Sequence, residues 1–468
     1  MQQVDRGRVS VMGVRTIKYV TALLVAFGMA QASAQAAETG GDVPEGVLPE
    51  GPAAISFDEI LADPTSPSRN LRYARKLVQE GNLVLAATAL ERILLLNPEL
   101  DRVRLYYAIV LYRIANYTEA EREFEVLQGS DKLPENLQRQ ADRYLEASRR
   151  QQRAFKGSFT LGAGAHYDSN RNSYPQADEF RVLDTLIDGT EEENADVGRL
   201  LTGTFDVTYD PGFQRLREFY AIATGLVDDQ VEEDSLDLAA GILEVGASYD
   251  ATVVEIVPHL RHEHLRLDGD LFARISEAGL RLQRRFRQVQ GLDAHIEGRA
   301  AYEEFSNTET LRFNNEQNGQ LYEIEAGAGY NISDSMRVAA SYTYGDKSAD
   351  VGFHSYESHK FRASYTWVFP NRMFALASGS VEFLDFDEID PFISPTTTRE
   401  DMDSRVRLTY GLPASLIATT FGTPQEPEFL RNLVLSVSGE YFRSDSNITN
   451  FDYENWRASA LVTKRFEF

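Results

Sequence analysis

From Gly157 to the end of the chain, apolar and polar residues alternate one by one over long stretches. In the last stretch, Trp456 and Ala458 fall on one face and Arg457 and Ser459 on the other. Successive side chains of a β-strand point to opposite sides, so a period of two predicts strands with one apolar face. The stretches run to about 10–13 residues, the length of tilted membrane-spanning strands and about twice that of strands in soluble sandwiches. The pattern therefore predicts strands that cross a membrane with their apolar faces toward lipid.

The alternation recurs often enough to predict an all-β transmembrane β-barrel of about 14 antiparallel strands, a fold of bacterial outer membranes. An even number of strands leaves both barrel ends of the chain in the periplasm, where connections are short. The expected strands cover 157–168, 199–210, 215–227, 236–248, 251–266, 271–286, 291–305, 318–331, 335–345, 357–369, 371–384, 402–412, 430–443 and 455–468.

The lengths of the connections agree with this orientation, with one exception. The link 412–429 is long although it is expected on the periplasmic side, so it folds under the barrel or contains a missed hairpin. The expected periplasmic links 210–214, 249–250, 331–334 and 370 are short, whereas the expected extracellular links 169–198, 307–317, 346–356, 385–401 and 444–454 are longer.

The final strand carries aromatic residues on its apolar face, at Phe466 and at the terminal Phe468. A terminal aromatic is how outer-membrane barrels end, and we expect these two residues to be the signal for the barrel-assembly machinery. With fourteen strands, the last strand 455–468 is expected to pair with the first, 157–168, and to close the barrel.

The period changes to a helical one between residues 70 and 153. Six pairs of similar residues recur there at a spacing of 34, which predicts two stacked helical hairpins. Pro98 closes the first hairpin, and 134–153 is expected to form a further helix that caps the stack. The pairs are Ala74–Ala108, Leu77–Leu111, Gly81–Ala115, Ala86–Ala120, Leu90–Phe124 and Ile93–Leu127.

This repeat resembles the tetratricopeptide repeat, so the expected architecture is a small all-α tetratricopeptide-repeat domain before the barrel. The resemblance implies a groove that holds a peptide or a neighbouring domain, but the same residues could instead only pack the array. Because about three repeats are usually needed for stability, the domain is expected to lean on another element. The expected groove residues are Leu71, Arg75, Val78, Leu105, Ile109 and Tyr112.

The N-terminus has the pattern of a secretory signal peptide, expected over residues 1–34. Arg15 and Lys18 precede the apolar stretch Tyr19–Met29, and Ala32 and Ala34 flank a small-residue cleavage site. Residues 35–69 are rich in Gly, Pro, Ala and acids, which predicts a disordered linker.

Composition excludes several functions. The net charge of -25 argues against nucleic-acid binding, and no cysteine is present to form a disulfide or a thiolate metal site. Acidic clusters at 191–193, 228–234 and 385–388 indicate solvated loops, or else divalent cations bridging to anionic lipid or polysaccharide. The segment 162–164 (Gly-Ala-Gly) lacks the Lys-Ser/Thr of a phosphate loop, so these glycines are expected to be close-packing positions and no nucleotide is expected.

His259, His262 and His264 are close enough in sequence to suggest a metal site. On a strand His262 and His264 share one face and His259 takes the other, unless Pro258 introduces a bulge. We therefore expect His259 to belong to a polar lumen together with its charged neighbours, and no metal site. The lumen-facing neighbours expected with it are Glu255, Arg261 and Glu263. No signature of serine or carboxylate catalysis is present, so we expect no catalytic residue, no cofactor and no enzyme activity.

The first strand ends in a distinctive segment, which contains Asp168, Ser169, Asn170, Asn172 and Pro175. Two helical repeats, a capping helix, this segment and then a barrel ending in Phe resemble the surface lipoprotein assembly modulator family.

The resemblance implies an outer-membrane translocation factor whose periplasmic repeats bind a client protein, often a surface lipoprotein, and whose barrel delivers it to the cell surface. The implied partners are this secreted or surface-exposed client and outer-membrane lipid. Two alternatives stay open: a polysaccharide-export barrel, and a general diffusion porin with an accessory repeat domain.

Overall fold

The computed structural model describes residues 65–130, 132–189, 192–286, 288–308, 311–416 and 428–468. The expected signal peptide, most of the expected linker and much of the link 412–429 lie outside these residues. The chain divides into a helical unit that ends at Lys156 and a barrel unit that spans Gly157–Glu467.

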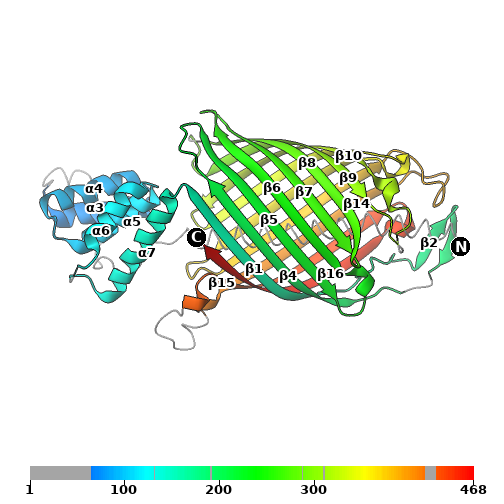
Figure 1. Cartoon of the computed structure of the whole chain (residues 1–468), viewed down its shortest axis with the longest axis horizontal. Helices are drawn as coiled ribbons and strands as arrows, with labels where there is room; N and C mark the ends of the chain where they lie inside the picture. The colour runs from blue at the N-terminus through cyan, green and yellow to red at the C-terminus, as the bar shows by residue number, and fades with distance from the viewer. Residues whose placement is uncertain (1–64, 131, 190–191, 287, 309–310, 417–427) are drawn as a thin grey trace. The chain divides into compact units, whose positions relative to one another are not determined.

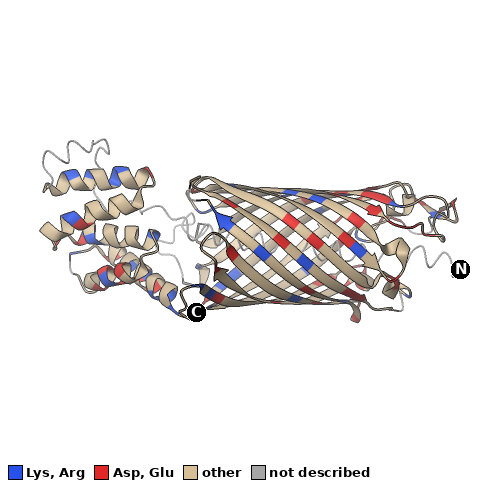
Figure 2. Ribbon diagram, turned by 90° about the horizontal axis from the view of Figure 1, so that it is seen from above, with Lys and Arg blue, Asp and Glu red and all other residues tan. Residues whose placement is uncertain are grey.

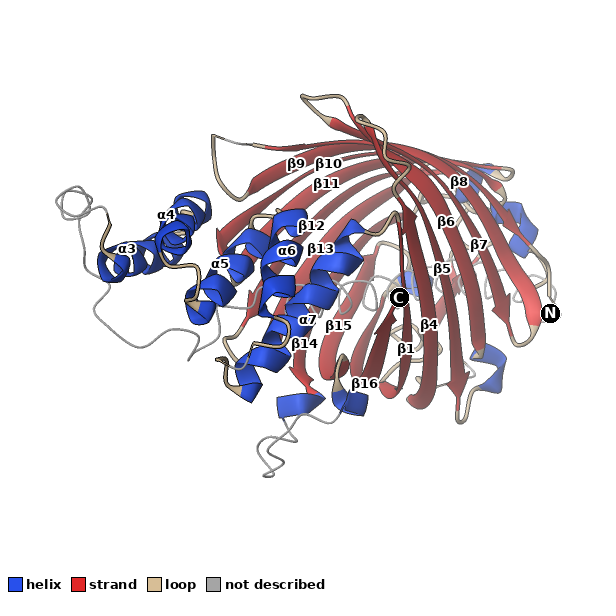
Figure 3. Ribbon diagram, turned by 60° about the vertical axis from the view of Figure 1, so that its left-hand side comes forward, coloured by secondary structure: helices blue, strands red, loops and turns tan. Residues whose placement is uncertain are grey.

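Five helices form the helical unit in the described residues, and they agree with the two expected hairpins followed by one more helix (Figure 3). Helix α3 packs against α4, α5 against α6, and α7 against α6. None of the described helices is long and apolar enough to cross a bilayer. The helices are α3 (Pro67–Gln79), α4 (Leu83–Leu96), α5 (Asp101–Arg113), α6 (Tyr117–Leu127) and α7 (Glu135–Gln152).

Residues paired at the 34-residue spacing occupy similar places in the two hairpins. The alanines of the pairs Ala74–Ala108 and Ala86–Ala120 are fully buried, because small side chains let two helices approach closely. The third pair lies in the turn of each hairpin with positive φ, at 77° for Gly81 and 59° for Ala115. Phe124, Leu90, Ile93 and Leu127 fill the seam and are almost completely buried.

Fourteen strands form one closed antiparallel barrel in the described residues, which confirms the predicted fold (Figure 1). All fourteen expected strands are present, with ends that differ by a few residues. They are β1 (Phe155–Asp168), β4 (Asp196–Tyr209), β5 (Leu216–Gln230), β6 (Leu238–Asp250), β7 (Glu255–Leu267), β8 (Asp270–Arg285), β9 (Leu292–Phe305), β10 (Gly319–Ser333), β11 (Met336–Ala349), β12 (Tyr356–Val368), β13 (Phe374–Phe386), β14 (Glu400–Pro413), β15 (Leu433–Ser446) and β16 (Tyr453–Glu467).

The barrel closes as expected, through pairing of β1 with β16 from Ser158–Glu467 to Asp168–Arg457. Apolar side chains point outward and stay exposed, as a lipid-facing band requires. Phe466 lies on this outward face and is 47% exposed. Its role as an assembly signal, like that of Phe468, stays a prediction. Other outward residues of the band include Leu161, Leu201, Leu243, Leu260, Ile296, Ile324, Phe361, Leu408 and Val437.

We call the barrel end where β1 finishes the loop end, and the opposite end the turn end. The loop end carries a short hairpin that the sequence did not reveal, β2 (Glu179–Val182) with β3 (Thr185–Asp188). This hairpin is tied to another loop, because the backbone N–H of Leu183 donates to the Phe392 carbonyl at 3.1 Å. One apolar cluster, around Phe272, Phe305 and Leu311, packs a loop onto the strands, and a second, of Ile393, Ile448 and Phe451, packs loops against one another.

Candidate functional site

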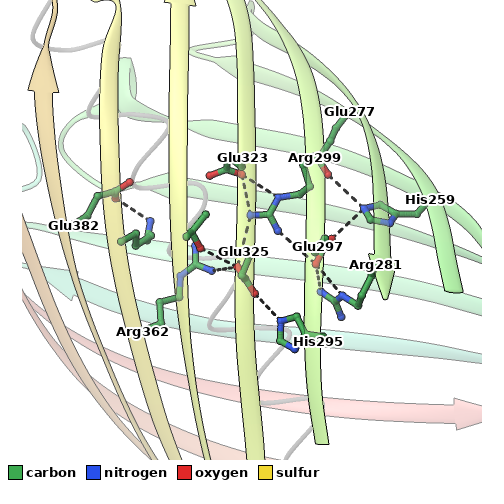
Figure 4. Close-up of polar contacts among 12 residues, drawn as sticks. His259, Glu277, Arg281, His295, Glu297, Arg299, Glu323, Glu325, Arg362 and Glu382 are labelled. Carbon is green, nitrogen blue, oxygen red and sulfur yellow. Dashed lines mark hydrogen bonds and ion pairs between the residues drawn. The ribbon is translucent and has the colours of Figure 1, made fainter. Parts of the chain in front are cut away.

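Charged and polar side chains point into the barrel from β7 to β13 and contact one another across neighbouring strands (Figure 4). We call this set the charged ladder. Basic and acidic positions are interspersed over the strands of the barrel (Figure 2). The ladder consists of His259, Glu277, Arg281, His295, Glu297, Arg299, Glu323, Glu325, Thr343, Lys360, Arg362 and Glu382.

Glu297 is one centre of the ladder and is only 3% exposed. Its carboxylate accepts hydrogen bonds from Arg281 Nε at 2.8 Å and Nη2 at 2.6 Å. His259 Nε2 lies 3.4 Å away and Arg299 Nη1 3.7 Å away. A buried carboxylate is costly unless it is paired, and these partners compensate for the burial of Glu297.

Arg299 connects this centre to a second one at Glu325. Its guanidinium donates from Nε to Glu323 at 3.0 Å, and Nη2 lies 3.7 Å from Glu325. Arg299 and Glu323 are direct cross-strand partners, which explains the short contact. Glu325 also contacts His295 Nε2 at 3.0 Å and Arg362 Nη1 at 3.3 Å.

Polar contacts continue from Glu325 along the strands that follow β10. Thr343 donates its hydroxyl to Glu325 at 3.0 Å, and Lys360 pairs with Glu382 at 2.9 Å. On β14 and β15, Arg405 lies 3.3 Å from Glu440, which also pairs with Arg407. The result is a polar wall of paired opposite charges.

The wall across the lumen is different, since the strand order places β1 and its neighbours opposite β10. Inward positions in the middle of these strands are mostly small and uncharged, whereas charged residues such as Asp168 and Asp206 lie nearer the strand ends. A Cβ on Gly164 would lie 2.2 Å from the Ala460 carbonyl oxygen, so this glycine allows close strand packing, as expected. The inward hydroxyls of this wall include Ser158, Thr160, Thr202, Thr204, Ser438 and Ser459.

The three histidines behave as the strand pattern predicted. His259 faces the lumen and belongs to the ladder, whereas His262 and His264 face outward and are exposed. Pro258 introduces no bulge, because the pairing of β6 with β7 keeps the same register on both sides of it. Among the described residues, no group of three acidic or histidine side chains is placed to hold a metal ion.

The segment after β1 binds the first strand to the last. The Asn455 amide donates to Asp168 at 2.9 Å, and the Trp456 N–H donates to the Ser169 hydroxyl at 2.9 Å. Asn170 is 3% exposed, and its amide donates to the Tyr174 carbonyl at 2.9 Å. This segment therefore acts as a lock at the loop end of the seam.

Asn170 completes the lock, and Asn172 and Pro175 follow it in the same loop. Asn170 also donates to the Glu454 carbonyl at 3.1 Å, and its side-chain oxygen accepts from the Tyr174 N–H at 2.6 Å. Asn172 reaches a neighbouring loop, where its amide donates to the Glu192 carbonyl at 3.0 Å. Pro175 is buried and begins the turn that leads to the β2–β3 hairpin.

His166 lies directly below the lock and is completely buried between two carboxylates. Its Nδ1 lies 2.8 Å from Asp168 and its Nε2 lies 2.6 Å from Asp228. The contact joins β1 to β5 across β4, so it stabilises the wall on the side of β1 that faces away from β16.

The expected groove of the helical unit needs a correction. Leu105 and Ile109 are completely buried in its core, so they pack the array and cannot contact a client. Leu71, Val78 and Tyr112 are partly buried and pack against the same core. Arg75 is also only partly exposed.

The exposed apolar surface of this unit lies instead on α4. Val84 and Leu95 are 66% and 78% exposed. Leu85 and Leu96 add to the same helix and are more than half exposed.

The loop around His354 is expected to be sensitive to pH. Burial, with Arg399 and Lys347 nearby, lowers the pKa of His354 from 6.5 to about 3. The neutral imidazole stabilises the folded loop fully above pH 6.5, and this contribution is lost as pH falls from about 6.5 to about 3. After correction for the intrinsic exchange rate, we expect residues 350–355 to be less protected from hydrogen exchange at pH 4 than at pH 7. H354N should abolish this loss of protection, and an equal loss of protection in both proteins would contradict the assignment.

The chain was compared with known proteins at the level of sequence and of structure. It matches no protein-family model and no curated protein sequence. Among solved structures, it is similar to OccAB3 of Acinetobacter baumannii, with 10% identity over 67% of this chain and 99% of that chain and a TM-score of 0.34.

It is also similar to a loop-deletion mutant of OmpT, an outer-membrane protein of Vibrio cholerae, with 9% identity over 67% and 100% of the two chains and a TM-score of 0.38. A third similarity is to OprD of Pseudomonas aeruginosa, with 9% identity over 67% of this chain and 95% of that chain and a TM-score of 0.32. None of these similarities assigns a solute or a partner to this chain.

Proposed function

We propose that this outer-membrane barrel is a channel for polar solutes, with the helical unit attached on its periplasmic side. The observation that carries the proposal is the charged ladder, a continuous polar wall inside a barrel with an apolar exterior. An inward wall built of paired charges supplies a hydrogen-bonding surface to hydrated solutes.

Chain connectivity and barrel convention support a periplasmic position of the helical unit. Helix α7 ends at Gln152 and β1 begins at Phe155, at the turn end of the barrel. Most links at this end are short, such as 334–335, and most links at the other end are longer, such as 387–399. The long link 414–432 at the turn end and the two-residue turn 268–269 at the loop end are exceptions. Short links face the periplasm in such barrels.

Planar-bilayer recording tests the channel directly. We expect the purified full-length protein to give steady unitary currents without any partner. The sample must first shift in mobility on a gel when boiled, which shows that the barrel is folded. A folded sample that gives no current in the absence of a client would reject the diffusion channel and favour a client-gated barrel.

We propose delivery of a client protein as a second candidate function, in line with the resemblance to surface lipoprotein assembly modulators. The exposed apolar side chains of α4, Val84, Leu85, Leu95 and Leu96, support it, since a water-facing apolar surface is typical of partner binding.

A deletion separates the two candidates. Removal of residues 67–152 from the full chain should reduce surface display of the client if the helices receive it. Unchanged surface proteomes together with unchanged currents would leave only the channel function.

A further inference from the structure

Four basic side chains gather on the outward face of β7 and β8, near the loop end. His262, His264 and Arg266 occupy alternate positions of β7, and Arg274 lies on β8 directly opposite His264. All four are exposed. The lipid-facing side of a barrel is normally apolar, so a basic cluster on it needs a physical reason.

The partners of these side chains leave most of their hydrogen-bond donors available. Arg266 uses Nε for the Gly269 carbonyl at 2.9 Å, and its terminal nitrogens are not engaged by this contact. Arg274 lies 3.8 Å from Glu304, in a pair whose side chains are 45% and 50% exposed. A pair this long and exposed is weak.

The two histidines are also available. His262 Nδ1 lies 3.0 Å from the Ser276 hydroxyl, and this contact leaves Nε2 available to a ligand. In the part of the chain that the structure describes, the side chain of His264 makes no hydrogen bond or ion pair.

The cluster lies at the border between the apolar band and the barrel rim. The outward residues on its turn-end side are apolar, with Leu260 on β7 and Ala278 on β8 directly opposite each other. On the loop-end side, β7 and β8 are joined only by Asp268 and Gly269, both with positive φ as in a tight hairpin turn. No long loop is inserted between these two strands above the cluster, and lipid head groups occupy this depth.

A strip of small residues continues from the cluster across the same face. Gly203, Gly225 and Gly241 are direct cross-strand partners of one another, and Gly241 is the partner of His264. A Cβ on Gly225 or Gly241 would meet no atom within 4 Å, so the strip is open toward lipid. It provides a flat floor beside the four basic side chains.

We propose that the cluster binds the phosphate head group of an outer-leaflet lipid, with the glycine strip receiving the sugar or acyl portion beside it. The terminal nitrogens of Arg266 and Arg274 would hold the phosphate, and His262 and His264 would bind its edge. Charge around the rim supports an anionic lipid at this place in particular. Outward residues near the loop end of other strands are acidic, including Asp229, Asp346, Glu357, Asp385 and Glu400.

The test compares wild type with the triple variant H264N/R266Q/R274Q, both as full-length protein in detergent. Binding of a diphosphorylated glycolipid and of a zwitterionic phospholipid is followed by native mass spectrometry. We expect the triple variant to bind the phosphorylated lipid about 10–100-fold more weakly, since each surface arginine contributes about 1 kcal/mol to binding of anionic lipid. The zwitterionic lipid should bind both proteins equally.

R199Q is the matched control. Arg199 is also outward and exposed, but it is paired with Asp229 at 3.2 Å, away from the cluster. R199Q should bind the phosphorylated lipid like wild type, and all samples should show the mobility shift on boiling.

Equal lipid binding by wild type and the triple variant would overturn the proposal. So would displacement of the lipid by millimolar inorganic phosphate, which would show a site for free phosphate. An equal loss of binding in R199Q would show an effect of rim charge in general, and would also reject a specific site.

Discussion

R299M is expected to destabilise the barrel by about 3 kcal/mol and to make the channel more selective for cations. Arg299 contacts Glu297, Glu323 and Glu325, of which Glu297 and Glu325 are largely buried. Its loss leaves carboxylates with fewer partners in a place that water solvates poorly. The same change removes a positive charge from the ladder wall. At low salt this changes the electrostatic energy of a permeating ion by about 1 kcal/mol, which corresponds to roughly fivefold in relative permeability.

Two measurements check this expectation. The urea midpoint of the boiling-dependent mobility shift reports stability, and the reversal potential in a salt gradient reports selectivity. R299K keeps the charge and should preserve the selectivity, although it loses the forked contact to Glu323. R199Q, which breaks an exposed pair, should change stability by at most about 1 kcal/mol. Wild-type behaviour of R299M in both measurements would show that the ladder carries neither stability nor selectivity.

N170A is expected to weaken the seam between β1 and β16 by about 2–4 kcal/mol. The Asn170 side chain makes three hydrogen bonds, two with the Tyr174 backbone and one with Glu454 on β16. Alanine leaves these backbone groups unpaired in a place where Asn170 is almost fully buried. Hydrogen exchange of the amides near Trp456 should therefore become faster, because the loop end of the seam opens more often.

Asn172 gives a control in the same segment. It is partly exposed, and its side chain bonds only to the neighbouring loop, at Glu192 and Asn194. N172A should therefore leave exchange at Trp456 unchanged. If N170A and N172A behave alike, the segment does not lock the seam and its position after β1 has another explanation.

The barrel could be predicted because lipid on one side and water on the other impose a period of two on every strand. The pairing of β1 with β16 followed from the strand number alone, and the register Asp168–Arg457 confirms it. The helical hairpins were predictable for a similar reason, since close helix packing requires small residues such as Ala74 and Ala108 at matching positions.

The charged ladder could not be derived from the sequence, because its contacts depend on register between strands. Arg299 and Glu323 are far apart in the chain, and only the pairing of β9 with β10 places them opposite each other. The one available signal was charge at alternate positions, as in Glu297-x-Arg299 and Glu323-x-Glu325. The β2–β3 hairpin was missed because its strands are only four residues long and carry mixed residues.

The groove prediction failed at Leu105 and Ile109 because α5 lies in the middle of the helical unit. It contacts α4, α6 and α7, so its apolar residues are covered on several sides. In a longer repeat array the same helix position can remain open. The exposed apolar residues of α4 show which surface of this short array is left uncovered.

Labelling of a single cysteine in the lumen tests the channel most directly, and the chain contains no natural cysteine that would interfere. Ser380 on β13 faces the lumen between Arg362 and Arg405, its two cross-strand partners. A charged, membrane-impermeant thiol reagent should lower the unitary current of S380C in one step. The same reagent should not change the current of A363C, since Ala363 faces lipid on the neighbouring strand. Absence of unitary current, or a current of S380C that the reagent leaves unchanged, would contradict a solute path along the charged ladder.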